Sequence, residues 1–273
     1  MKKYVNLFVF VFMVGTCFSQ GKAQTKSAVS YKNPVVDIAM PDPTVIKAAD
    51  GYFYVYATES TRNVPIMKSK DLVQWTYCNT AFTNKTRPRF EPKAGIWAPD
   101  INYISGKYVL YYAMSVWGGE QTCGIGVATA DSPQGPFTDH GKMFRSNEIG
   151  VQNSIDPSFL QYEGRNYLVW GSFRGIYVIE LTEDGLSLKP GAEKKRIAGT
   201  AFEAAYIHKH GDYYYMFASI GSCCEGIRST YKVVVGRSKK VWGPYKDKSS
   251  KPMLKNGYSL VIGANDHFVG NGH

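Results

Sequence analysis

Four acidic residues recur at the same place in four repeats of this sequence, each six to nine residues ahead of a turn glycine. A carboxylate costs free energy within an apolar strand unless it is paired or used. A single acid of this kind would be a structural cap, but several in register favour a shared site. In chain order, the acids are Asp42, Asp100, Asp156 and Glu203.

Converging carboxyl groups can hydrolyse a glycosidic bond. One carboxylic acid protonates the leaving oxygen, and a carboxylate activates water. A third carboxylate nearby helps to keep the acid protonated through like-charge repulsion, and it orients the sugar. Asp42, Asp156 and Glu203 fit this division of roles.

The elements that position these acids are strands. Each repeat has a turn glycine followed by an aromatic and β-branched segment, and the spacing is close to 50 residues. This period predicts an all-β propeller with about four strands per blade. The first strand of each blade lies at the axis, so its acid would face a common pocket. A β-sandwich is the alternative architecture. The four segments are 51–58, 106–115, 164–173 and 211–220.

The composition is that of a globular protein: 44% of the 273 residues are hydrophobic and 14% are aromatic, which excludes wholesale disorder. The formal net charge is +10. A basic protein can meet nucleic acid, an anionic surface or an acidic polysaccharide. The cations are scattered rather than clustered, so we expect no nucleic-acid partner.

The N-terminus has the layout of an export signal, with an early pair of lysines and a short apolar run. We predict a signal peptide over 1–23, a spacer over 24–32 and a propeller glycosidase domain over 33–273. The protein would be periplasmic or secreted, and lipid attachment at Cys17 is the alternative mode of export. We expect no transmembrane segment, because the apolar run is too short.

The cysteines beyond the signal do not have the spacing of a zinc site. The adjacent pair Cys223-Cys224 would form either a vicinal disulfide, which export permits, or two buried thiols.

The sequence resembles glycoside hydrolase family 43, and within it the endo-acting arabinanases, over residues 33–273. The resemblance implies a five-bladed β-propeller that inverts the anomeric carbon. It also implies an arabinan substrate, with endo-hydrolysis of the 1,5-α-L-arabinofuranosidic bonds in pectin side chains, and we expect a monomer. The matching motifs are PDPTV at 41–45, GIWAPDI at 95–101, NSIDPSF at 153–159, FEAAYI at 202–207, SCCEGIRSTYKVVVGRS at 222–238 and the terminal NDHFVGNGH.

The same resemblance implies a role for each acid. Asp42 matches the general base, Glu203 the general acid, and Asp156 the residue that tunes the pKa and orients the substrate. In an inverting enzyme, the acid and the base lie about 6.5–9.5 Å apart to admit a water.

Four further residues are candidates for substrate binding. Trp97 and Trp117 have positions suited to stacking on sugar rings, with core packing as the alternative. Asn153 and Ser154 precede Asp156 and would hydrogen-bond substrate hydroxyls, with a turn cap as the alternative.

His273 matches the histidine that holds a hydrated calcium ion on the axis of arabinanases. Because the sequence stops there, 258–273 would be only the innermost part of the last blade. We therefore expect a blade truncated at the C-terminus, so that either the chain is a fragment or residues 25–38 help to close the ring.

Other activities stay open at this point. An exo-acting α-L-arabinofuranosidase or β-xylosidase would use the same three acids. A non-catalytic carbohydrate-binding propeller would not need them, and a retaining fructan-cleaving propeller would need motifs that this sequence lacks.

Overall fold

The computed structural model describes residues 30–270 and residue 272. The expected signal peptide, most of the spacer, Cys17 and His273 lie outside these residues. The chain divides into two units, 1–32 and 33–273, and the fold described here is that of the second unit.

The structure has four antiparallel sheets of four strands each, and every sheet follows chain order. The first sheet holds β1 (Thr44–Lys47), β2 (Phe53–Tyr56), β3 (Pro65–Ser69) and β4 (Trp75–Thr80). The second holds β5 (Gly95–Ile104), β6 (Lys107–Ser115), β7 (Gly124–Ala130) and β8 (Thr138–Arg145). The third holds β9 (Ser158–Tyr162), β10 (Arg165–Trp170), β11 (Ile176–Glu180) and β12 (Lys195–Ala198). The fourth holds β13 (Glu203–His210), β14 (Tyr213–Ile220), β15 (Lys232–Ser238) and β16 (Ser259–Ile262).

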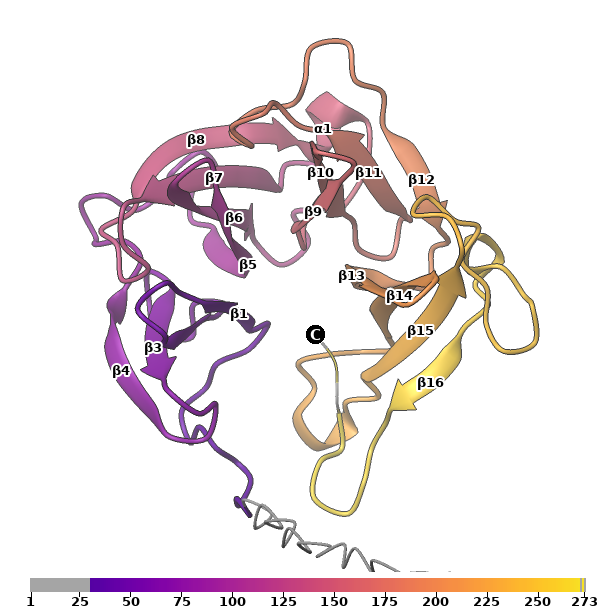
Figure 1. Cartoon of the computed structure of the whole chain (residues 1–273), viewed down its shortest axis with the longest axis horizontal. Helices are drawn as coiled ribbons and strands as arrows, with labels where there is room; N and C mark the ends of the chain where they lie inside the picture. The colour runs from indigo at the N-terminus through magenta and orange to yellow at the C-terminus, as the bar shows by residue number, and fades with distance from the viewer. Residues whose placement is uncertain (1–29, 271, 273) are drawn as a thin grey trace, which may run out of the picture. The chain divides into compact units, whose positions relative to one another are not determined.

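The sheets are arranged around a common axis, with the first strand of each sheet innermost (Figure 1). The prediction of an all-β propeller is therefore confirmed, and the sandwich alternative is excluded. The described residues form four sheets rather than five, and β16 is the outer edge strand of the fourth. The expectation that 258–273 form only the innermost part of a last blade is therefore wrong for Ser259–Ile262. The helical elements of the described residues are short: α1 (Ser146–Ile149), η1 (Gly226–Arg228) and η2 (Met253–Lys255). Within the described ranges, no helix has the length and apolar character needed to cross a membrane.

The repeated glycines make the tight turns between the first and second strands. Gly51 and Gly106 have φ angles of 83° and 84°, a region that residues with a side chain rarely adopt. In the second and third sheets, the aromatic strand that follows the glycine is covered on both faces by neighbouring sheets. In β6, for example, eight of nine residues are buried. This explains why these strands are almost continuously apolar.

Three hydrophobic clusters join neighbouring sheets, one between each consecutive pair. Within the described residues, no such cluster joins the fourth sheet to the first, and Figure 1 shows the segment after β16 running back toward the centre on that side. Representative cluster members are Tyr54 with Leu110, Tyr111 with Leu168, and Val178 with Met216.

The antiparallel order also decides which loops share one end of the ring. One end of the ring carries the starts of the first and third strands of each sheet, together with the ends of its second and fourth strands. In the first sheet, this end carries residue 42, the loop 57–64 and the loop 81–94. The candidate site lies there.

Candidate active site

A pocket of about 450 Å³ brings together most of the residues that the sequence singled out. Its lining comes from the starts of first strands, the ends of second strands and the loops beside them, in all four sheets. The predicted residues that line it are Asp42, Trp97, Trp117, Asn153, Asp156 and Glu203.

The backbone turns sharply at equivalent positions of the first three sheets. Asp42, Ala98 and Asp156 have φ angles of 51°, 40° and 58°, and each directly precedes a proline. Positive φ is costly for residues with a side chain and is concentrated at functional sites. The equivalent of Asp42 and Asp156 in the second sheet is thus Ala98, not Asp100.

Asp100 lies two residues further along, within β5, and it does not line the pocket. Its carboxylate joins three sheets: it accepts hydrogen bonds from the Phe159 amide at 2.7 Å, the Asn102 side chain at 2.7 Å and the Thr44 hydroxyl at 3.4 Å. Enclosure by these sheets raises the pKa of Asp100 to about 6. The expectation that four acids share one site is therefore wrong for this residue.

Asp42 is held by a hydroxyl from the next strand. Thr58, two residues after the end of β2, donates a hydrogen bond to Oδ2 of Asp42. The same hydroxyl accepts a hydrogen bond of 2.7 Å from the Ala98 amide. The Asp42 side chain stays partly exposed to the pocket, so water can approach it.

Glu203 is the first residue of β13 and is 7% exposed. Two neutral hydroxyl groups donate to its carboxylate: Ser172 to Oε2 at 2.7 Å, and Tyr231 to Oε1. Ser172 comes from the third sheet and in turn accepts a hydrogen bond of 2.9 Å from Asn153. The orientation of Glu203 is therefore fixed from both sides by residues that carry no charge.

Asp156 is buried beside the other two acids. Burial raises its pKa well above the usual range, and the negative charges of Glu203 and Asp42 raise it further. The Ala204 amide opposes this shift by donating a hydrogen bond. Asp156 therefore keeps its proton to a higher pH than an exposed aspartate does, because its raised pKa disfavours the charged form.

The two tryptophans form one aromatic wall. Their ring centroids lie 5.5 Å apart with a tilt of 49° between the planes. Trp117 is 77% exposed, which excludes core packing for this residue. Trp97 is half-buried: it packs against Ala113, Cys123 and Ile155 and also lines the pocket. Aromatic faces that line a pocket suit the apolar faces of sugars.

Asn153 and Ser154 have different surroundings in the structure. Asn153 lines the pocket and contacts Ser172. Ser154 is fully buried; its hydroxyl donates to the Val151 carbonyl at 2.8 Å and accepts from the Trp170 indole at 3.1 Å. Ser154 thus has the turn role that was the alternative for this pair, because its side chain points into the core instead of the pocket.

Cys223 and Cys224 line the pocket as free thiols, with Sγ atoms 2.7 Å apart. Burial is the main reason why the pKa of Cys223 rises to about 12.

The hydroxyl residues around the carboxylates are the part of the site that the sequence analysis missed. Each repeat has a serine or threonine within two residues of the end of its second strand, seven to nine residues after the turn glycine. Three of the four line the pocket, and the fourth pairs with Glu203 in the sheet. This recurrence was a signal available in the sequence. The four residues are Thr58, Ser115, Ser172 and Ser219.

The calcium ion implied for the axis has no ligand cluster among residues 30–270 and 272: no group of three or more His, Cys, Asp or Glu side chains there could hold a metal. His273 lies outside the described residues.

A propeller with three carboxyl groups and an aromatic wall in one pocket at its axis defines a glycoside hydrolase. The chain belongs to glycosyl hydrolases family 43, whose family model matches residues 31–273.

Individual relatives include both endo- and exo-acting enzymes. The chain is 38% identical over 245 residues to the extracellular endo-α-(1→5)-L-arabinanase 1 of Bacillus subtilis, covering 85% of this chain and 75% of the relative. It is 35% identical over 260 residues to the extracellular exo-α-(1→5)-L-arabinofuranosidase ArbA of Cellvibrio japonicus, covering 85% and 73%. Among solved structures, the Cellvibrio cellulosa α-L-arabinanase superposes with a TM-score of 0.77 at 33% identity, covering 85% and 81%; it has also been solved with arabinohexaose.

Proposed function

We propose that this enzyme hydrolyses the 1,5-α-L-arabinofuranosidic bonds of arabinan by an inverting, endo-acting mechanism. The observation that carries the proposal is the meeting of Asp42, Asp156 and Glu203 in one pocket beside Trp97 and Trp117. The arabinanases among the relatives supply the substrate class.

The proposed roles follow from the surroundings of each acid. Asp42, partly exposed and oriented by Thr58, takes a proton from the attacking water. Glu203, buried and held by Ser172 and Tyr231, gives its proton to the leaving oxygen. Asp156 lies beside both and orients the substrate, and repulsion among the three like-charged carboxyl groups favours retention of a proton within the group. Trp97, Trp117 and Asn153 hold the sugar rings and hydroxyls.

Endo action is favoured over exo action by the form of the pocket wall. Trp117 lies in a glycine-containing loop and is exposed rather than covered by a lid. A chain that continues past the cleaved bond can lie along such a wall, whereas exo action needs a blocked end.

The experiment for this assignment is incubation with linear debranched arabinan, followed by separation of the early products. Endo action releases oligosaccharides of several lengths before arabinose accumulates. Release of arabinose alone from the first minutes would favour the exo-acting alternative. Binding without any hydrolysis would favour a non-catalytic carbohydrate-binding propeller.

We propose five blades for the complete fold, a hydrated calcium ion held at His273, and a monomer in solution. Residues 1–23 would direct export, with lipid attachment at Cys17 as the alternative, and 33–273 would form the hydrolase domain. The count of blades is tested by an experimental structure. The metal is tested by elemental analysis before and after chelation.

A further inference from the structure

A second pocket, of about 410 Å³, lies at the same end of the propeller as the three carboxylates. It is formed by the loop 57–64 between β2 and β3 and the loop 81–94 between β4 and β5, with Met114 at one side. The segment 91–97 separates it from the active site: Glu91 lines the second pocket and Trp97 lines the first.

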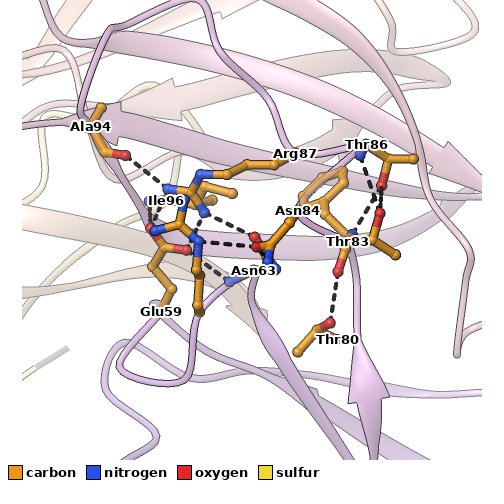
Figure 2. A network of polar contacts seen from close by, with 11 residues as sticks. Glu59, Asn63, Thr80, Thr83, Asn84, Thr86, Arg87, Ala94 and Ile96 are labelled. Atoms are coloured by element: carbon orange, nitrogen blue, oxygen red, sulfur yellow. Dashed lines mark hydrogen bonds and ion pairs between the residues drawn. The ribbon is translucent and has the colours of Figure 1, made fainter.

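The lining of this pocket is strongly basic. Four cations line it, against one acid, Glu91. Glu91 forms an ion pair with Arg145. Arg87 forms a buried two-pronged ion pair with Glu59 (Figure 2). The cations that remain are Arg62, Arg89 and Lys93, which are exposed and have no acidic partner within the part of the chain that the structure describes.

The two arginines are held in place before any ligand arrives. Arg62 Nε donates to the Asn84 side-chain oxygen at 3.1 Å, and Arg89 Nη2 donates to the Asn84 carbonyl at 2.9 Å. Asn84 is fixed in turn by the Asn63 amide at 3.1 Å (Figure 2). Each guanidinium has five N–H groups and uses one of them on Asn84, so donors remain for a planar anion.

Beneath the two arginines, Arg87 and Glu59 are also fixed by hydrogen bonds. Arg87 donates to the Ala94 carbonyl at 2.8 Å and to Asn63 at 3.2 Å, in addition to its ion pair with Glu59. Glu59 also accepts from the Ile96 amide at 2.9 Å. These bonds tie both loops to the start of β5, so the pocket keeps its position relative to Trp97.

We propose that this pocket binds a carboxylate of a uronate-containing polysaccharide, the acidic backbone to which arabinan side chains are attached in pectin. This inference rests on the proposed function, because arabinan itself is neutral and needs no cationic subsite. Arg62, Arg89 and Lys93 supply charge-assisted hydrogen bonds to the carboxylate. A backbone held there keeps its arabinan side chain next to the catalytic pocket.

The test compares binding of unesterified oligogalacturonate to the full chain and to two triple variants, by calorimetry at low ionic strength. Arg62→Gln/Arg89→Gln/Lys93→Gln should weaken binding about tenfold or more. The matched control, Lys239→Gln/Lys240→Gln/Lys248→Gln, removes the same number of exposed cations elsewhere and should bind like the wild type. Methyl-esterified oligogalacturonate, which lacks the charge, should bind weakly to all three proteins.

Equal loss of binding in both triple variants would overturn the proposal, because binding would then depend on the net charge of the protein and not on this pocket. Equally tight binding of a DNA duplex of matched charge would also overturn it, in favour of general attraction to polyanions. Hydrolysis of debranched arabinan by the wild type tests the proposed function separately, because that substrate carries no carboxylate. Failure of one experiment therefore leaves the other interpretable.

Discussion

The hydroxyl of Thr58 donates a hydrogen bond to the carboxylate of Asp42 across the first sheet. The hydroxyl is itself fixed by the Ala98 amide of the second sheet. The proposed general base is thus oriented by a contact that spans two blades, and the packing of those blades determines where the base points.

Replacement of Thr58 by valine keeps the shape of the side chain and removes this contact. A hydrogen bond to a charged group contributes about 1.5–3 kcal/mol, so kcat on arabinan should fall about 10- to 100-fold. Thr58→Ser keeps the hydroxyl and should restore most of the activity. An unchanged kcat in Thr58→Val would show that Asp42 does not depend on this hydroxyl.

Glu203→Gln should abolish hydrolysis of arabinan, because it removes the proton donor with little change in volume. General acid catalysis contributes about 10²–10⁴-fold. Aryl arabinofuranosides with good leaving groups need little protonation and should lose much less activity. Asp42→Asn is the contrasting variant: water must be activated whichever group leaves, so both substrates should fail. Equal losses on both substrates for Glu203→Gln would contradict its assignment as the acid.

Trp117→Ala should weaken the use of long substrates and leave folding intact, because the ring is 77% exposed. Loss of one stacked aromatic face should lower kcat/KM on linear arabinan about tenfold. A short aryl arabinofuranoside, which reaches fewer sugar positions, should be less affected. Trp117→Phe keeps an apolar ring and should fall between the two. If both substrates lost activity to the same degree, Trp117 would not lie along the substrate chain.

Asp100 makes stability depend on pH. Its pKa is about 6 in the folded protein and 3.8 as the ordinary value, so the folded state binds the proton more tightly. The contribution of this group to stability is therefore greatest at low pH and is lost as pH rises from about 4 to about 6. Asp100→Asn should remove that dependence. The difference in Tm between wild type and variant should change between pH 4 and 6 and be flat above; a constant difference would contradict the assignment.

The repeats made the propeller predictable, because a turn glycine and a buried aromatic strand leave a strong pattern at a fixed period. The three pocket acids were also visible, since a carboxylate in an apolar strand stands out. Asp100 was not separated from them by counting from the glycine: its distance of six residues differs by only two from that of Asp156, yet the residue equivalent to Asp156 is Ala98, eight residues ahead of Gly106. The buried position of Ser154 could not be predicted from residue types either. Whether a serine faces a pocket or a core depends on a backbone turn, which residue types alone do not reveal.

The most direct test of the account is the stereochemistry of hydrolysis. Linear debranched arabinan is mixed with the enzyme, and the anomeric protons of the new reducing ends are followed by NMR from the first minutes, before mutarotation. If Asp42 activates water on one side of the sugar while Glu203 protonates the oxygen on the other, the first product from this α-linked substrate is the β-anomer. An α-anomer as the first product would contradict the assignment of Asp42 and Glu203 as base and acid.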